Sequence, residues 1–443
     1  MEDSVQLSSK NSRLAGLSVL KTRSFILLWS GSLISMLGDA FSMVALPWLV
    51  IQLTDNAFTL GTVMATAAIP RAVFILVGGA LADRFSPRRV ILDTKLVYLV
   101  LLSSLAFLVI TEMVEMWMVY LYAFLSGAVG AFAFPAQSAI LPQLVAKDDL
   151  QIANSVMGGS AQICFLVGPA LAGTMIVLLS GGSISRQADG ASPDDLQSIG
   201  LVFAIDAITF LFSWVIVQRI LIPQDRDRRS DSSDSLLESI KGGFSYLKTD
   251  RSLFILMFYI AAVGFLAQGP ISIGIPLLAS ERFLEGAAAY GFLMSSHSAG
   301  ALLGVILAGT LPMPKAKHLG IMVLSLDAIE GATLIFLGFA SETVYGMLIL
   351  FNMGIIGGFL QIFFMTWIQK RIPQDMLGRI MSVIIFANMG LAPISAALSG
   401  YIVEYVGLTM LFLGCGGLFM SVALLSMFSS SIRAMGLPPE AMR

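Results

Sequence analysis

The chain has 443 residues, of which 57% are hydrophobic and only 12% are charged, and its formal net charge is -2. This composition excludes an ordinary soluble domain, because a soluble protein of this length cannot bury so many apolar side chains in its core. It also offers nucleic acid no basic face, so no nucleic-acid partner is expected, and the lipid bilayer is the solvent that the chain predicts.

Apolar runs of spanning length alternate with short polar loops along the whole chain. About 20 apolar residues cross the hydrocarbon core as a helix, and the pattern predicts six spans in each half. The predicted fold class is an all-α membrane protein with twelve transmembrane helices in two six-helix bundles. The predicted spans are 24–52, 58–82, 90–110, 117–137, 153–179 and 199–221, then 252–278, 290–312, 319–339, 345–367, 380–405 and 407–429.

The cations indicate the orientation of these spans. Of the 26 Lys and Arg residues, only Arg186 and Arg282 fall in loops on one side, and Arg71 and Lys95 lie inside or at the end of spans. The others collect on the opposite side, as cytoplasmic loops do. Both termini are therefore predicted to be cytoplasmic, in a multi-pass protein of the bacterial inner membrane. Lys95 and Asp93 are expected near the cytoplasmic end of their span, as anchors.

A polar linker divides the chain into two repeated halves. A shift of 227 positions places Asp148, Leu150, Ser155 and Ala170 on Asp375, Leu377, Ser382 and Ala397. Parallel repeats with a site between them at the membrane midplane are a transporter plan. The predicted domains are a cytoplasmic tail at 1–23, a bundle at 24–221, a linker at 222–251 with an amphipathic helix over 235–248, a second bundle at 252–429 and a tail at 430–443.

Five ionisable side chains within the predicted spans are candidates for proton coupling. A charge at mid-bilayer costs about 2.5 to 3.5 kcal/mol, so each of these side chains requires either a compensating interaction or a function. Asp39 and Arg71 are predicted to form an ion pair that breaks when Asp39 takes a proton or when substrate displaces it, and static structural pairing is the alternative. Asp206, Asp327 and Glu330 are expected mainly to support the helices through hydrogen bonds. A proton relay through Asp327 and Glu330, three residues apart, is the alternative.

Aromatic and methionine side chains are dense in the first, fourth and tenth spans. Ring faces and thioethers adapt to many hydrophobic ligands, and packing against lipid is the alternative. The candidate residues of a substrate cavity are Trp29, Phe132, Phe351 and Met353.

The loop after the second span contains Gly-Ala-Leu-Ala-Asp-Arg-Phe-Ser-Pro-Arg-Arg over 79–89. This stretch resembles the G-x-L-a-D-R-x-G-R-K/R signature of the major facilitator superfamily, although Ser86 and Pro87 replace the usual glycine and basic residue. The resemblance implies a cytoplasmic gate that latches one state closed. The gate residues would be Gly79, Leu81, Asp83, Arg84, Arg88 and Arg89.

A second motif lies in the fifth span. Gly168-Pro169-Ala-Leu-Ala-Gly173 resembles the G-P-x-x-G-G signature of proton-coupled exporters, and an ordinary proline kink is the alternative. The stretches 25–41, 134–142 and 205–210 are similar to the drug:proton antiporter branch that holds macrolide efflux pumps and the enterobactin exporter.

These resemblances imply a secondary active transporter in which two bundles rock around a central cavity lined by spans one, four, seven and ten. The expected function is proton-coupled efflux of a small lipophilic substrate, such as a drug or a macrolide. The alternatives are export of a particular metabolite such as a siderophore, transport of a lysolipid, and a receptor that transports nothing.

No enzymatic activity is expected, because no nucleophile and base stand at catalytic spacing and no metal site is indicated. No G-x-x-x-x-G-K-[ST] motif for ATP occurs, so the proton gradient is expected to supply the energy and no cofactor is expected. The protein is expected to be a monomer whose partners are substrate, protons and the bilayer.

Overall fold

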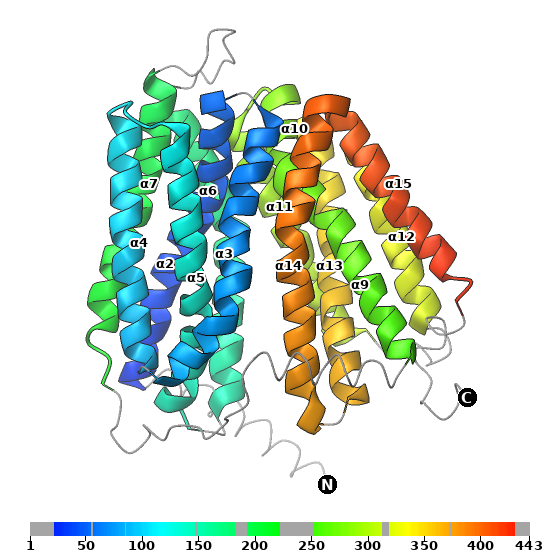
Figure 1. Ribbon diagram of the computed structural model, residues 1–443, viewed down its shortest axis with the longest axis horizontal. Helices are drawn as coiled ribbons and strands as arrows, with labels where there is room; N and C mark the ends of the chain where they lie inside the picture. The colour runs from blue at the N-terminus through cyan, green and yellow to red at the C-terminus, as the bar shows by residue number, and fades with distance from the viewer. Residues whose placement is uncertain are drawn as a thin grey trace.

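The computed structural model describes residues 22–54, 56–84, 86–146, 149–181, 193–221, 251–311, 319–372 and 374–429. Within these ranges the chain is helical and contains no strand. Figure 1 shows the long helices side by side. The first half contains α2 (Arg23–Thr54), α3 (Ala57–Arg84), α4 (Pro87–Ile110), α5 (Met116–Leu144), α6 (Leu150–Leu179) and α7 (Pro193–Val217). The second half contains α9 (Arg251–Gly269), η3 (Pro270–Gly274), α10 (Ile275–Arg282), α11 (Ala287–Thr310), α12 (Leu319–Leu337), α13 (Thr343–Arg371), α14 (Gln374–Val406) and α15 (Leu408–Ser426).

The lengths and surfaces of these helices suit a membrane. Eleven helices of the described part are long and apolar enough to cross one, and α14, with 33 residues, is a twelfth long helix. Large apolar side chains such as Phe107, Leu178 and Phe336 are more than 60% exposed, which in water would be costly. The predicted all-α membrane fold is confirmed. The predicted amphipathic helix at 235–248 and most of both tails lie outside the described residues.

Several helices extend beyond their predicted ends, among them α14, which begins at Gln374 rather than at 380. The helix α5 continues to Leu144, whereas the apolar run ends at 137, and α7 begins at Pro193, before the predicted start at 199. Hydropathy detects only the part of a helix that lies in hydrocarbon. The backbone hydrogen bonds of a helix are internal, so a helix can continue beyond the hydrocarbon, as at the polar start of α7. The end of α5 instead packs Ile140, Leu141 and Leu144 into an apolar cluster.

The helices form two bundles of six spans. In the first bundle α2 packs on α6 and α7, α3 on α5, and α4 on α7; in the second α11 packs on α13, α12 on α15, and α14 on α9. Figure 1 shows the first bundle in blue to green and the second in green to red. The helix α2 begins and α15 ends on one face of the molecule, called here the terminal face. The loops at 56, 111–115, 283–286, 338–342 and 407 lie on the other, called here the opposite face.

The seventh span contains a π-helical turn. The helices α9 and α10 are joined without a break by η3, and the N–H of Ile275 donates to the carbonyl of Pro270, five residues earlier. Pro270 has no N–H, so the ordinary α-helical ladder is already interrupted there. Turns of this kind occur often at functional sites of α-helices. The span therefore has a built-in irregular point that hydropathy does not reveal.

The bundles meet through two crossings rich in glycine, called here the glycine crossings. At the first, a Cβ added to Gly61 of α3 would lie 2.7 Å from the carbonyl oxygen of Ala396 and 3.0 Å from the Cα of Gly400, both on α14. At the second, Gly173 of α6 and Gly291 of α11 each lie against backbone of the partner helix. Glycine lets helix backbones approach closely. Both crossings lie toward the opposite face, so the two bundles are in contact there.

Candidate functional site

Two charged side chains of the first bundle are exposed at mid-helix. Asp39 of α2 and Arg71 of α3 both lie far from the ends of their helices. A charge at this depth faces water or protein rather than lipid. No cationic nitrogen among the described side chains lies within 4.0 Å of an Asp39 carboxylate oxygen in this conformation, and the predicted ion pair stays a prediction.

Arg71 is turned toward α5 instead of toward Asp39. Its guanidinium and the hydroxyl of Tyr98 lie over Gly130 of α5, where an added Cβ would be 3.0 Å from each group. The Tyr98 hydroxyl donates to the carbonyl of Ser126 at 2.8 Å. A larger residue at Gly130 would displace both groups. The absence of a side chain at Gly130 therefore leaves the space that the Arg71 guanidinium occupies.

Lys95 is not the surface anchor that the sequence predicts. It is only 4% exposed and its ammonium points into the first bundle, where it donates to the Ser35 hydroxyl of α2 at 2.9 Å. The Nζ atom also lies 5.6 Å from the centre of the Phe210 ring of α7. The ring of Tyr98 stacks on that ring at 5.0 Å. Asp93, by contrast, is exposed near the start of α4, as expected.

Asp206 of α7 is held by hydroxyl groups. It is 1% exposed, and the Ser42 hydroxyl of α2 donates to its carboxylate. The hydroxyl of Thr209 lies 3.3 Å from the other carboxylate oxygen. Gly38 of α2 leaves the space for this contact, because a Cβ there would collide with Asp206 and Thr209. These contacts are the supporting hydrogen bonds expected for Asp206.

The two carboxylates of α12 face different neighbours. Tyr259 of α9 donates to Asp327 at 2.5 Å, and Asp327 is 3% exposed. Glu330 is half-buried, and its Oε1 lies 4.0 Å from where a Cβ on Gly357 of α13 would be. No hydrogen bond joins the two carboxylates among the described side chains. The hydroxyl partner expected for Asp327 is present, and the proton relay stays a prediction.

The whole chain resembles known membrane transporters. The profile of the Major Facilitator Superfamily matches residues 28–396. The chain belongs to this superfamily. Members of this superfamily are transporters rather than enzymes. The chain is therefore a multi-pass membrane transporter.

Several characterised proteins are similar over most of their length. Macrolide efflux protein A of Streptococcus pyogenes is 22% identical over 93% of this chain and 97% of its own. The enterobactin exporter EntS of Escherichia coli is 25% identical over 88% of each chain, and the staphyloferrin A transporter of Staphylococcus aureus is 22% identical over 87% and 90%. All three are named for the movement of a small molecule, and two of them for its export.

Solved structures of transporters share the fold. The nucleoside transporter NupG, in a mutant form, superimposes with a TM-score of 0.72 at 14% identity, over 92% of this chain and 100% of its own. A bacterial homologue of the iron transporter ferroportin in its inward-facing state gives 0.67 at 14% identity, over 92% and 98%. At this identity the likeness concerns the fold alone.

The gate motif of the superfamily lies at the terminal face. Four of its side chains, Gly79, Leu81, Asp83 and Arg84, lie outside the described side chains, although the helix α3 continues to Arg84.

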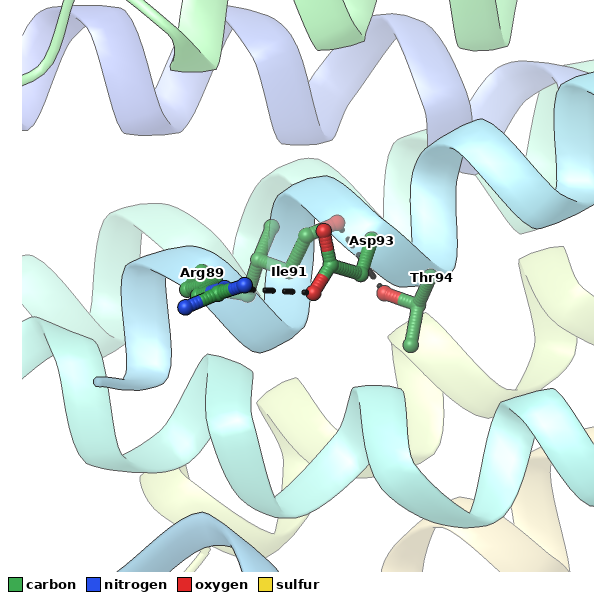
Figure 2. A network of polar contacts seen from close by, with 4 residues as sticks. All are labelled: Arg89, Ile91, Asp93 and Thr94. Atoms are coloured by element: carbon green, nitrogen blue, oxygen red, sulfur yellow. Dashed lines mark hydrogen bonds and ion pairs between the residues drawn. The ribbon is translucent and has the colours of Figure 1, made fainter. Parts of the chain in front are cut away.

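The two described arginines of the motif stay within the first bundle. Arg88 donates to the carbonyl of Gln218 after α7 at 2.5 Å. Arg89 pairs with Asp93 one turn later at 3.8 Å, beside the bond from the Thr94 hydroxyl to the Ile91 carbonyl (Figure 2). In this conformation neither arginine is seen to bridge the bundles. The predicted latch role stays a prediction.

The exporter-type motif of α6 forms one side of a glycine crossing. Gly168 lies against Ala40 of α2, whereas Pro169 and Gly173 lie against α11. The N–H of Ala170 donates to the Ser295 hydroxyl of α11 at 3.0 Å. The motif therefore contacts helices of both bundles. If α6 bends at this motif, as predicted, the contact between the two bundles would change.

The four candidate cavity residues differ in surroundings. Trp29 is half-buried and its indole N–H donates to Ser160 of α6 at 2.8 Å. Phe132 stacks on Phe74 at 6.2 Å. Phe351 is half-buried. Met353 is 0% exposed and packs in the apolar core, so it is not a cavity wall in this conformation.

Sequence reasoning missed the partners of the charged residues. It did not single out Ser35, Ser42 or Tyr98, and it placed Lys95 at a membrane surface. A signal was present, because Ser35, Asp39 and Ser42 follow one another at spacings of four and three, which places them on one side of α2.

Proposed function

We propose that this transporter exports a small lipophilic compound, such as a drug or macrolide, in exchange for protons. The observation that carries the proposal is the exposed carboxylate of Asp39 at mid-span. A carboxylate there can take a proton or attract a cationic substrate, but not both at once. Competition between a proton and the substrate for this one carboxylate is sufficient to couple the flow of protons to the flow of substrate.

The relatives and the energetics support this proposal. The names of two similar proteins describe efflux or export. One elementary charge moving through the membrane potential is worth about 2.3 kcal/mol per 100 mV, and a pH difference adds to this. We further propose that the protein works as a monomer in the bacterial inner membrane with both termini in the cytoplasm. The opposite face would then be on the outer side of the membrane, and the glycine crossings would close the transporter on that side.

The test is transport by purified protein in proteoliposomes with an imposed pH gradient. A panel of fluorescent lipophilic cations and macrolides is followed for wild type and for Asp39→Asn. We expect gradient-driven transport by wild type and its loss in Asp39→Asn, because the amide cannot exchange a proton at neutral pH. The matched control is Glu112→Gln, the same chemical change in the exposed loop after α4, which should transport like wild type.

The outcomes separate coupling from substrate. If Asp39→Asn transports at the wild-type rate with the wild-type pH dependence, Asp39 is not the coupling group. If wild type moves no member of the panel, the drug and macrolide assignment fails and a dedicated metabolite becomes the better candidate.

A siderophore is the second candidate substrate, favoured by Arg71. This exposed guanidinium at mid-span has no carboxylate partner within 4.0 Å among the described side chains. Guanidinium groups bind carboxylates in a bidentate fashion. Two relatives are named for siderophores, enterobactin and staphyloferrin A. Export of a carboxylate or catecholate siderophore that is lost in Arg71→Gln, while cation transport is retained, would support this candidate.

A further inference from the structure

Lys95 is a buried cation that has no direct anionic partner. Its ammonium donates to the Ser35 hydroxyl and faces the Phe210 ring. Within the described part, no carboxylate oxygen lies within 4.0 Å of it. Ser35 is able to accept, because its own proton is donated to the carbonyl of Ser32 at 3.2 Å. An ammonium taken out of water is costly unless an anion nearby compensates its charge.

Asp39 is the carboxylate that lies one helical turn from the Lys95 contact on α2. The Ser35 hydroxyl that accepts from Lys95 precedes Asp39 by one helical turn, so the ammonium is held beside the same stripe of α2. Lys95 and Arg71 are the two cations whose charges act on Asp39. Asp39 is also the carboxylate that acts on Lys95.

Other helices of the first bundle, and α4 itself, also bring polar groups near this pair. Asp206 of α7 accepts from Ser42. Arg71 of α3 lies over Gly130 beside Tyr98 of α4. Tyr122 of α5 is a buried phenol. Asp206 is the other carboxylate among these groups, and its described hydrogen bonds are with Ser42 and Thr209 rather than with Lys95. The contact of Lys95 is instead on α2, one turn from Asp39.

We propose that Lys95 is the internal counter-ion of Asp39, a positioning residue that keeps this carboxylate ready to release its proton. While Asp39 is ionised, the ammonium stabilises it across the bundle. A proton that moves from water onto the carboxylate removes this attraction, and its return to water restores it. Lys95 thus favours the proton-free state that must follow each turnover. The proposal rests on the proposed coupling role of Asp39.

The first test is the pH dependence of transport by Lys95 variants. In Lys95→Met the carboxylate keeps its proton to higher pH, so the pH of half-maximal transport should rise by about one unit. Lys95→Arg retains the charge and should keep the wild-type dependence. Arg219→Gln, which removes an exposed cation after α7, should leave it unchanged. An unaltered dependence in Lys95→Met, or an equal shift in Lys95→Arg, would overturn the proposal.

The second test needs no substrate. Thermal unfolding in detergent is measured for Lys95→Met, for Asp39→Asn and for the two combined. Removing one charge leaves the other uncompensated, whereas removing both does not, so the combined variant should recover about half or more of the stability lost in Lys95→Met. Additive losses would contradict the pairing. If wild type transports nothing, the proposed function fails, and this cycle still decides whether the two residues form a pair.

Discussion

At the scale of single residues, Gly38 determines how closely α2 approaches α7. It lies beside Asp206 and Thr209, and there is no room for even a methyl group between the helices. The Ser42 hydroxyl reaches Asp206 one turn further along α2. The buried carboxylate thus receives the hydrogen bond from Ser42 because a glycine lets α2 come close, whereas Thr209 is on its own helix.

Replacing Gly38 by alanine should destabilise the protein. The added Cβ would force Asp206 or the helix to move, and overpacking of this kind costs about 1 to 3 kcal/mol. The measurement is the midpoint of thermal unfolding in detergent. The control is Gly158→Ala in α6, where nothing lies within 4 Å and alanine should gain about 0.5 to 1 kcal/mol. Equal midpoints for the two variants would show that the contact is not tight.

The sequence locates charged residues in spans better than it locates their partners. Asp39, Asp206 and Asp327 stand out because carboxylates are rare in apolar runs. Lys95 was misplaced, because the end of an apolar run does not tell whether a lysine side chain extends toward water or toward the bundle. That choice depends on Ser35 and Phe210, which come from two other helices.

At the scale of helices, apolar length predicts each span but not its contacts. The Gly-Pro motif of α6 suggested bending, and the structure adds that its residues form the crossing with α11. The π-helical turn η3 could not be predicted, since a proline within an apolar run is equally compatible with a simple kink. The turn packs against α14 and α15, and the order of residues does not show this packing.

The crossing of α6 and α11 should open when Gly291 is enlarged. A valine there would meet the carbonyl of Pro169, so the helices would have to separate at the opposite face. Spin labels at 112 and 341, in loops of different bundles, should report a longer distance in Gly291→Val. Cys164 and Cys415 are first replaced by alanine so that only the labels react.

Gly309→Val is the matched control for this crossing, because Gly309 lies on the same helix and has nothing within 4 Å. Its label distances should equal those of wild type. A crossing that stays closed in Gly291→Val would mean that the backbone contact does not hold the bundles together.

At the scale of the whole molecule, one carboxylate joins the two bundles at the opposite face. Glu404 of α14 accepts a hydrogen bond from the N–H of Ala57, the first residue of α3, at 3.0 Å. The side chain of Asn56 accepts from Thr59 in the same first turn. An anion at a helix N-terminus contributes about 0.3 to 1 kcal/mol, so Glu404 favours the closed arrangement.

Replacing Glu404 by glutamine should shift the population toward opening at this face. A loss of up to about 1 kcal/mol corresponds to a change of up to about fivefold in the ratio of open to closed molecules. The same spin labels measure it. Glu285→Gln is the control, because Glu285 accepts from Thr343 within the second bundle only. Identical distance distributions in wild type and Glu404→Gln would exclude the contribution.

The sequence predicts the twelve spans and their division into two bundles, because both follow from hydropathy and from the repeat. It does not predict which face is closed. That depends on a bond such as the one from Ala57 to Glu404, whose two residues are 347 positions apart. The order of residues alone does not show that two residues so far apart in the chain are in contact.

The glycine crossings have one more consequence, which concerns entropy. Ordering a flexible side chain at an interface costs about 0.5 to 1.5 kcal/mol, and glycine has no side chain to order. Gly61 and Gly400 meet through backbone that is already rigid within its helix. The glycine pair itself can therefore separate and meet again without freezing and releasing rotamers, and the ordering cost falls only on side chains beside it, such as Glu404. An interface of this composition suits a contact that must be broken and remade at every turnover.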